Sequence, residues 1–178
     1  MTGSSGTFDA PGNIGNGRNN QIDIETTLPL DKLGLTNGRL KTSSIWRDGV
    51  VRDPVTGMKR RVSGQRPQYI TMTLTQDIES LKSTWSIFFY NCWKESYYRL
   101  AEVNHPYVVP PYIELSWTYK PTPAWSLQAS IMNPGRFSYD DTQYMYTGSR
   151  AGQSPSEIDE LKIKSQARLY IEIRKTFD

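Results

Sequence analysis

The sequence predicts an all-β fold, an antiparallel β-barrel segment of about seven strands, and three observations support it. Aromatic residues make up 12% of the 178 residues, and Gly, Pro, Ser and Thr are spread along the chain, as in proteins built of strands and turns. Apolar and polar residues alternate in about seven segments of about ten residues each. The connections between these segments alternate between short and long.

The first part of the chain is expected to precede the sheet. Residues 1–20 form a flexible, loop-like segment in this prediction, because Gly and Asn in the run from Asn13 to Asn20 tolerate left-handed backbone and offer no apolar face. The ordered part, residues 21–178, begins near Gln21 with alternation that continues to Leu30.

Six of the predicted strands alternate cleanly, so that each has one apolar face. The segment from Arg39 to about Val51 alternates less cleanly. The apolar positions of the other six are Ile22, Ile24, Leu28 and Leu30; Ile70, Met72, Leu74 and Ile78; Leu81, Trp85, Ile87 and Phe89; Ile113, Leu115, Trp117 and Tyr119; Trp125, Leu127, Ala129 and Ile131; and Leu169, Ile171, Ile173 and Phe177.

The connections sort by length along the chain. Short ones are predicted at 31–38, 79–80 and 121–123, and long polar ones at 52–67, 92–110 and 133–164. Short periplasmic turns and long outer loops are typical of a transmembrane β-barrel of the bacterial outer membrane. If the long loops are external, the seventh strand ends the chain at the periplasmic side.

Trp46, Trp85, Trp117 and Trp125 lie at or near the ends of predicted strands, which favours a belt of aromatic side chains at the membrane interface. A buried core position is the ordinary alternative for each Trp. Alternation by itself also fits a soluble, small β-barrel that binds an apolar ligand inside. Both architectures therefore stay open on periodicity alone.

Several ordered stretches resemble a known family. They are Leu28 to Leu35, Asp53 to Gly57, Arg61 to Pro67, Gln76 to Ile78, Leu81-Lys82 with Trp85, and Tyr98 to Val103. Together they resemble the C-terminal β-barrel region of TonB-dependent outer-membrane receptors, over nearly the whole chain from Phe8 to Phe177.

This resemblance implies a barrel of about 22 strands with an N-terminal plug, located in the cell outer membrane. Such a receptor binds a scarce ligand such as a siderophore and takes it up with energy delivered through TonB. The chain has room for only the last seven strands, so we expect it not to transport alone. Its expected partners are the remaining strands and plug, membrane lipid, the barrel-assembly machinery and, through the missing N-terminal part, TonB.

The two ends of the sequence bear on this expectation. Met1 to Gly6 is rich in Gly and Ser and does not resemble a signal peptide, which indicates either a piece of a longer precursor or a soluble protein. In this family the assembly machinery reads a C-terminal strand ending in an aromatic residue. Leu169, Ile171, Ile173 and Phe177 fit that signal, although Asp178 follows the terminal aromatic.

No catalytic, metal or cofactor site is predicted, and the chain is not expected to be an enzyme. His105 is the only histidine and lies beside Pro106 in a predicted loop, so neither a catalytic triad nor a zinc site has its parts. Cys92 is the only cysteine. Asp140 and Asp141, and Glu157, Asp159 and Glu160, lack the spacing of a calcium loop.

Two further features belong to the predicted outer loops. Lys59, Arg60 and Arg61 are candidates for contact with an anionic ligand or a lipopolysaccharide phosphate. Ser154-Pro155-Ser156-Glu157 reads as a capping box and predicts a short helix to about Lys164. The net charge of +3 comes from mixed acidic and basic residues, so nucleic acid is not an expected partner.

Overall fold

The computed structural model of the chain describes residues 2–3, 6–7 and 14–177. At the start of the chain, β1 (Thr2–Gly3) pairs with β2 (Gly6–Thr7). The other residues expected in the N-terminal loop up to residue 13, namely 1, 4–5 and 8–13, lie outside the described ones, as does Asp178. The first long strand begins at Gly17, four residues before the predicted start of order.

The fold is all-β, as predicted. The long strands and their short companions are β3 (Gly17–Pro29), β4 (Gly38–Arg52), β5 (Lys59–Arg61), β6 (Gln68–Ile78), β7 (Ser83–Tyr90), β8 (Trp93–Tyr98), β9 (Glu102–Val109), β10 (Tyr112–Thr122), β11 (Trp125–Met132), β12 (Ser138–Met145), β13 (Glu157–Lys164) and β14 (Arg168–Lys175). The 3-10 helices η1 (Asp31–Leu33) and η2 (Glu79–Leu81) are single turns, and no helix in the described ranges is long and apolar enough to span a membrane.

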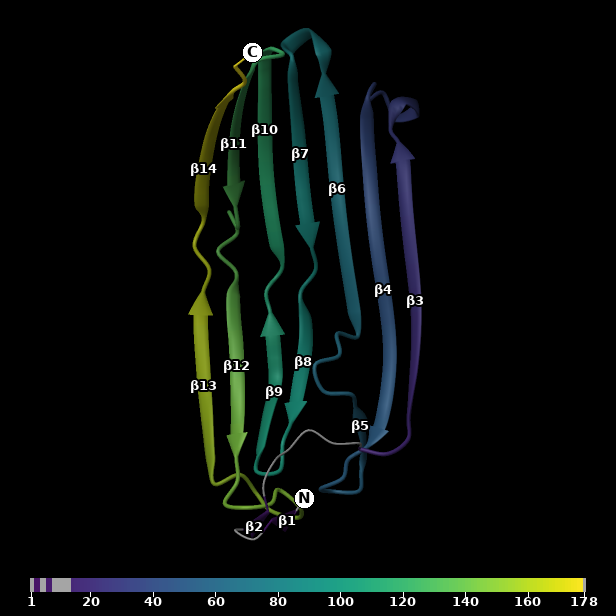
Figure 1. Ribbon diagram of the computed structural model, residues 1–178, viewed down its shortest axis with the longest axis vertical. Coiled ribbons are helices and arrows are strands. Elements are labelled where there is room, and N and C mark those ends of the chain that lie inside the picture. Colours follow the sequence, from purple (N-terminus) through teal and green to yellow (C-terminus); the bar gives the residue numbers. More distant parts are fainter. Residues whose placement is uncertain (1, 4–5, 8–13, 178) are drawn as a thin grey trace.

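The main sheet is antiparallel, with the order β14-β11-β10-β7-β6-β4-β3 and with β5 paired to the end of β4. A second antiparallel sheet has the order β13-β12-β9-β8. Figure 1 shows that each strand of the second sheet continues a strand of the first, β8 after β7, β9 before β10, β12 after β11 and β13 before β14. Neither sheet closes on itself, and β3 and β14 form the two edges of the main sheet.

Two of the three predicted long loops contain strand hairpins, which corrects the prediction. The segment 92–110 forms the hairpin of β8 and β9, and the segment 133–164 contains the hairpin of β12 and β13. The predicted helix up to Lys164 is wrong, because Glu157–Lys164 pairs residue by residue with β12. Ser154, the predicted capping residue, therefore has no helix to cap, and the backbone N–H and the hydroxyl of Ser156 both donate to the carbonyl of Met145 across the hairpin.

The predicted short turns are present and lie at one end of the sheet. η1 connects β3 to β4, η2 connects β6 to β7, and a turn at residues 123–124 connects β10 to β11. The backbone of Gly34 and of Lys82 is left-handed where each single-turn helix ends. The C-terminus lies at this same end, opposite the hairpin tips and β5 (Figure 1).

The strand register joins the predicted apolar faces into one continuous face. Leu115 lies opposite both Ile87 and Ile131, and Trp117 lies opposite both Trp85 and Ala129. Leu28 lies opposite Leu40 at the far edge, in the same register. We call this surface the apolar face and the opposite side of the sheet the polar face.

The sheet has almost no conventional core. Among the described residues, the buried apolar side chains are Leu30, Val51 and Trp93. A soluble domain of this length would bury a contiguous set of large apolar side chains. Here those side chains lie on a face that no other described part of the chain covers.

Candidate functional site: the two faces of the sheet

The apolar face is exposed even on the central strands. Ile87 of β7 is 42% exposed and Leu115 of β10 is 40% exposed, although both have neighbouring strands on either side. By contrast, Ser130, on the polar face of β11, is 2% exposed. The apolar side chains are therefore directed outward, and the polar face is the more covered one.

The four tryptophans predicted for a membrane interface all lie on the apolar face. Trp85, Trp117 and Trp125 gather near the short turns, where the rings of Trp85 and Trp117 are 6.2 Å apart. Leu81, Ser83, Trp85, Trp117 and Tyr119 line a shallow groove of about 570 Å³ there. Trp46, by contrast, lies toward the other end of β4.

The distance between the levels of Trp85 and Trp46 follows from their register partners on β6. Trp85 pairs with Gln76 and Trp46 pairs with Gln68, eight residues earlier in β6. At 3.3 to 3.4 Å per residue this is roughly 27 Å of strand. A strand tilted by about 40° would place the two levels roughly 20 Å apart along a membrane normal, comparable to the apolar band of about 25 Å in outer-membrane barrels.

The proposed assembly signal lies on the edge strand β14. Leu169, Ile171 and Ile173 alternate along it and are exposed, and Phe177 beyond its end is exposed as well. Lys175 lies 4.6 Å from the ring centroid of Phe177 and 5.1 Å from that of Trp125. These cation–π contacts attach the chain end to Trp125 at the start of β11.

The three consecutive cations in β5 do not lie on one face of the strand, because successive side chains of a strand point to opposite faces. Lys59 and Arg61 are exposed, opposite Arg52 and Val50 of β4. Arg60 points to the other side, where its Nε donates to the carboxylate of Asp53 at 2.5 Å. The sequence groups the three as one anion site, whereas the structure divides them.

Asp53 is the most deeply buried side chain of the described residues, at 1% exposed. Its Oδ2 accepts hydrogen bonds from Arg60 and Arg150, and its Oδ1 accepts the backbone N–H groups of Val55 and Thr56. Burial by itself raises the pKa of Asp53, but the bonds from Arg150, Thr56, Arg60 and Val55 together outweigh it and hold the pKa at about 2. The carboxylate is therefore charged throughout the physiological range.

The Asp53 cluster ties three connections together at the hairpin end. Asp53 itself lies in the turn after β4, and Arg150 lies in the connection between β12 and β13. The Nε of Arg150 also donates to the carbonyl of Arg99, in the tip between β8 and β9, at 2.7 Å. The ring of Tyr98 lies 4.5 Å from the Arg60 guanidinium and 5.5 Å from that of Arg150. Nothing in the spacing of these residues predicts their meeting.

A second cluster, of aromatic rings around Arg66, lies on the polar face where the two sheets meet. The rings of Tyr90 and Tyr112 are stacked at 5.2 Å, and Trp93 lies 5.5 Å from both Tyr69 and Tyr90. Arg66 lies 4.2 Å above the ring of Trp93. Its side chain is 41% exposed, so part of this cluster remains open on the polar face.

Glu95 is the carboxylate that pairs with Arg66 in that aromatic cluster. Arg66 donates to Glu95 at 2.6 Å, and the hydroxyl of Tyr97 donates to its other oxygen at 2.9 Å. The indole nitrogen of Trp93 is buried and makes no hydrogen bond to any residue that the structure describes. This combination of rings, a cation and a carboxylate is the most structured candidate for ligand contact on the polar face.

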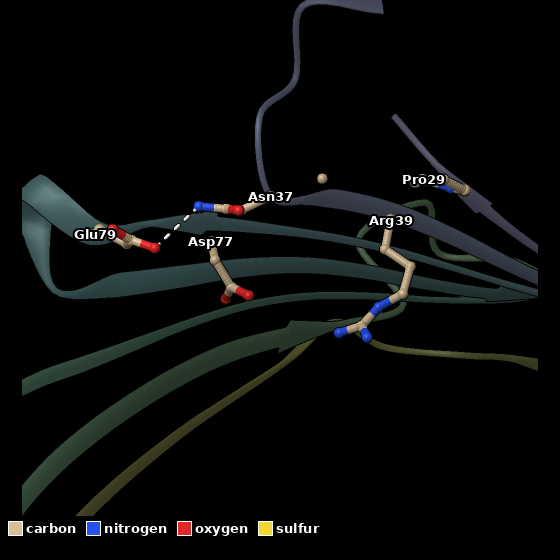
Figure 2. Close-up of a pocket in the computed structure, with 6 residues that line it drawn as sticks. Pro29, Asn37, Arg39, Asp77 and Glu79 are labelled. Carbon is tan, nitrogen blue, oxygen red and sulfur yellow. Dashed lines mark hydrogen bonds between the residues drawn. The ribbon is translucent and has the colours of Figure 1, made fainter. Parts of the chain in front are cut away.

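A polar groove lies at the opposite end, beside the short turns. It has a volume of about 340 Å³ and is lined by Pro29, Asn37, Gly38, Arg39, Asp77 and Glu79. Figure 2 shows Asn37 donating to Glu79, while Arg39 and Asp77 project from neighbouring strands on the same side of the sheet. Asp77 also accepts a hydrogen bond from the Thr84 hydroxyl at 2.6 Å, so it is held within the sheet.

No protein-family model, curated protein or solved structure matches this chain.

The residues considered for catalysis or metal binding are scattered. His105 lies in strand β9 and not in a loop. Asp140 lies 3.6 Å from Lys162, and Asp141 accepts from Asn104 at 3.4 Å. Across residues 2–3, 6–7 and 14–177, no three His, Cys, Asp or Glu side chains gather as metal ligands. Cys92 is a free, exposed thiol between β7 and β8.

Proposed function

We propose that this chain forms part of the wall of an outer-membrane β-barrel, in a receptor that binds a scarce ligand such as a siderophore and takes it up with energy from TonB. The observation that supports this proposal most is the continuous apolar face, exposed on central as well as edge strands. Burying such a face in hydrocarbon stabilises it by about 25 cal/mol per Å² of apolar surface, and lipid can cover it from outside.

The direction of the apolar face favours a membrane barrel over the soluble alternative. A soluble barrel that encloses an apolar ligand directs its apolar side chains inward and its polar ones to water. Here Ser130 and the Arg66 cluster lie on the polar face, whereas Ile87 and Leu115 on the apolar face are open. Polar residues toward a lumen and apolar residues toward lipid are the arrangement of outer-membrane barrels.

The two edges of the main sheet indicate what else the proposal requires. The unpaired backbone groups of an edge strand cannot be left in hydrocarbon, so β3 and β14 would each need a further strand. In a receptor of this family those strands, and the plug, belong to the remainder of the barrel. The assignment to a TonB-dependent receptor, its ligand and its partners rests on the sequence resemblance alone.

Neighbouring residues on β10 provide a direct test. Leu115 lies on the apolar face and Ser116 on the polar face, so we would introduce Leu115→Cys or Ser116→Cys into a Cys92→Ser background. A fluorophore on each thiol would be exposed to a quencher attached to lipid tails and to a water-soluble quencher. We expect the lipid quencher to act on position 115 and the soluble one on position 116.

The same samples test membrane dependence. Circular dichroism and heat-modifiable gel migration would be compared with and without detergent micelles, and strand formation is expected in micelles only. A cooperative, monodisperse fold in plain buffer, with position 115 inaccessible to both quenchers, would instead establish the soluble barrel with an apolar interior.

A further inference from the structure

The apolar face ends in a group of cations at the hairpin end of β3, β4 and β5. Arg18 and Arg61 lie on either side of Val50, and Lys59 lies directly opposite Arg52. We call these four residues, Arg18, Arg52, Lys59 and Arg61, the outer basic patch. All four are exposed, and the register places them on the same side of the sheet as Leu40 and Trp46.

The charges of the outer basic patch are poorly compensated. Arg18 lies 3.3 Å from Asp48, and within the described ranges no carboxylate pairs with Arg52, Lys59 or Arg61. Like charges directly opposite each other on neighbouring strands are unfavourable, and Arg52 and Lys59 are register partners of this kind. The third cation of β5, Arg60, is excluded because it points to the other face and is neutralised by Asp53.

The space between these side chains suits a small anionic group. Arg18, Arg52 and Lys59 line a surface groove of about 420 Å³ together with Asn16, Gly17 and the two valines of β4. Guanidinium groups bind phosphate oxygens in bidentate geometry, and an ammonium group adds a point charge. The groove therefore combines the charge and the donors that a phosphate group requires.

The position of the outer basic patch relative to Trp46 identifies the source of that phosphate. Val50 and Arg52 lie four and six residues beyond Trp46 on the same face of β4, roughly 13 to 20 Å along the strand. At the tilt of about 40° used above, this is roughly 10 to 15 Å along the membrane normal, somewhat beyond a headgroup layer of about 5 to 8 Å on each side of the hydrocarbon. With Trp46 at the interface, the long Arg and Lys side chains of the patch can reach back to the headgroups. We propose that the outer basic patch binds the phosphate groups of membrane lipids next to the barrel wall.

This inference rests on the proposed function, and its test keeps the two apart. The full chain would be folded in neutral detergent micelles and titrated with short-chain phosphatidylglycerol or phosphatidylcholine, with bound lipid counted by native mass spectrometry. The test variant is Arg52→Gln with Lys59→Gln. The control is Arg39→Gln with Lys41→Gln, which removes two exposed cations from the polar face of the same strand.

We expect the unaltered chain to prefer phosphatidylglycerol. A cation near an anionic surface is worth about fivefold in affinity, so the test variant should bind it about 25-fold more weakly and the control within about twofold. Equal weakening by both variants, or none by either, would overturn the lipid site. Displacement of the lipid by inorganic phosphate at equal concentration would overturn it too, in favour of a free-anion site.

Circular dichroism of the same micelle samples separates this outcome from the larger proposal. A chain that folds in micelles but shows no headgroup preference refutes the lipid site and leaves the barrel proposal standing. A chain that does not fold in micelles refutes the barrel proposal, and the lipid site with it.

Discussion

Arg150 and Asp53, 97 residues apart in the sequence, form an ion pair in which both side chains are almost completely buried. Replacing Asp53 with Asn would leave Arg60 and Arg150 charged, buried and without a counter-charge. Such a loss costs about 3 to 5 kcal/mol in the free energy of unfolding. Urea unfolding of the micelle-folded chain measures it.

The matched control for this prediction is Arg174→Gln. Arg174 pairs with Glu172 on β14 but is largely exposed, and exposed pairs contribute about 0 to 1 kcal/mol. Equal losses in the two variants would mean that the Asp53 cluster does not hold the three connections together.

Acid should weaken the same cluster in a narrow range of pH. The pKa of Asp53 is lowered from its ordinary value of 3.8 to about 2, so the unfolded chain binds a proton more readily than the folded one. The stabilisation is complete above about pH 4 and is lost as the pH falls through about 2, a total of roughly 2 kcal/mol. The difference in unfolding free energy between the unaltered chain and Asp53→Asn should shrink over that range.

Charge on the apolar face should be costly, and charge on the polar face should not. Leu115→Arg, in the middle of β10, is expected to destabilise the micelle-folded chain by about 2 to 4 kcal/mol. Ser116→Arg, one residue along on the polar face, should cost less than about 1 kcal/mol. Equal effects at the two positions, measured by urea unfolding in micelles, would contradict the assignment of the faces.

Removing the Arg66 side chain should destabilise the fold, because Glu95 loses its charged partner. In Arg66→Met the buried carboxylate of Glu95 loses the hydrogen bond from Arg66 and retains the one from the Tyr97 hydroxyl. We therefore expect the free energy of unfolding to fall by about 1 to 3 kcal/mol. The ring of Trp93 also loses its cation, which should change the near-ultraviolet circular dichroism. Arg99→Gln, whose own pair with Glu102 is exposed on the arginine side, is the control and should alter neither signal.

The faces of the central strands were predictable because each has one apolar side. Once a strand forms here, the side chains of Ile113, Leu115, Trp117 and Tyr119 must lie on one face. The observed register of β10 places these four residues on the apolar face. The hairpin of β12 and β13 was missed for the converse reason. Asp140, Asp141 and Thr142 are polar on both faces, so alternation of hydrophobicity is absent there even though the backbone is paired.

The clusters on the polar face could not have been found from local patterns. Asp53, Arg60 and Arg150 come together through pairing between segments far apart in the chain, and no spacing rule connects them. The same applies to Arg66 and Glu95. One local signal was present, since the alternation rule applied to Lys59, Arg60 and Arg61 would have separated Arg60 from the other two.

The hairpins of β8 with β9 and of β12 with β13 would make the rim of the proposed barrel more rigid than irregular loops would. An irregular loop of this length that closes around a ligand must order its backbone, at about 1 to 2 kcal/mol per residue. In these hairpins the backbone is already fixed by strand pairing, and the Asp53 cluster fixes their tips to the turn after β4. If the chain forms a barrel wall as proposed, a ligand arriving at this end would meet a rigid rim, and its shape would determine selectivity more than loop closure would.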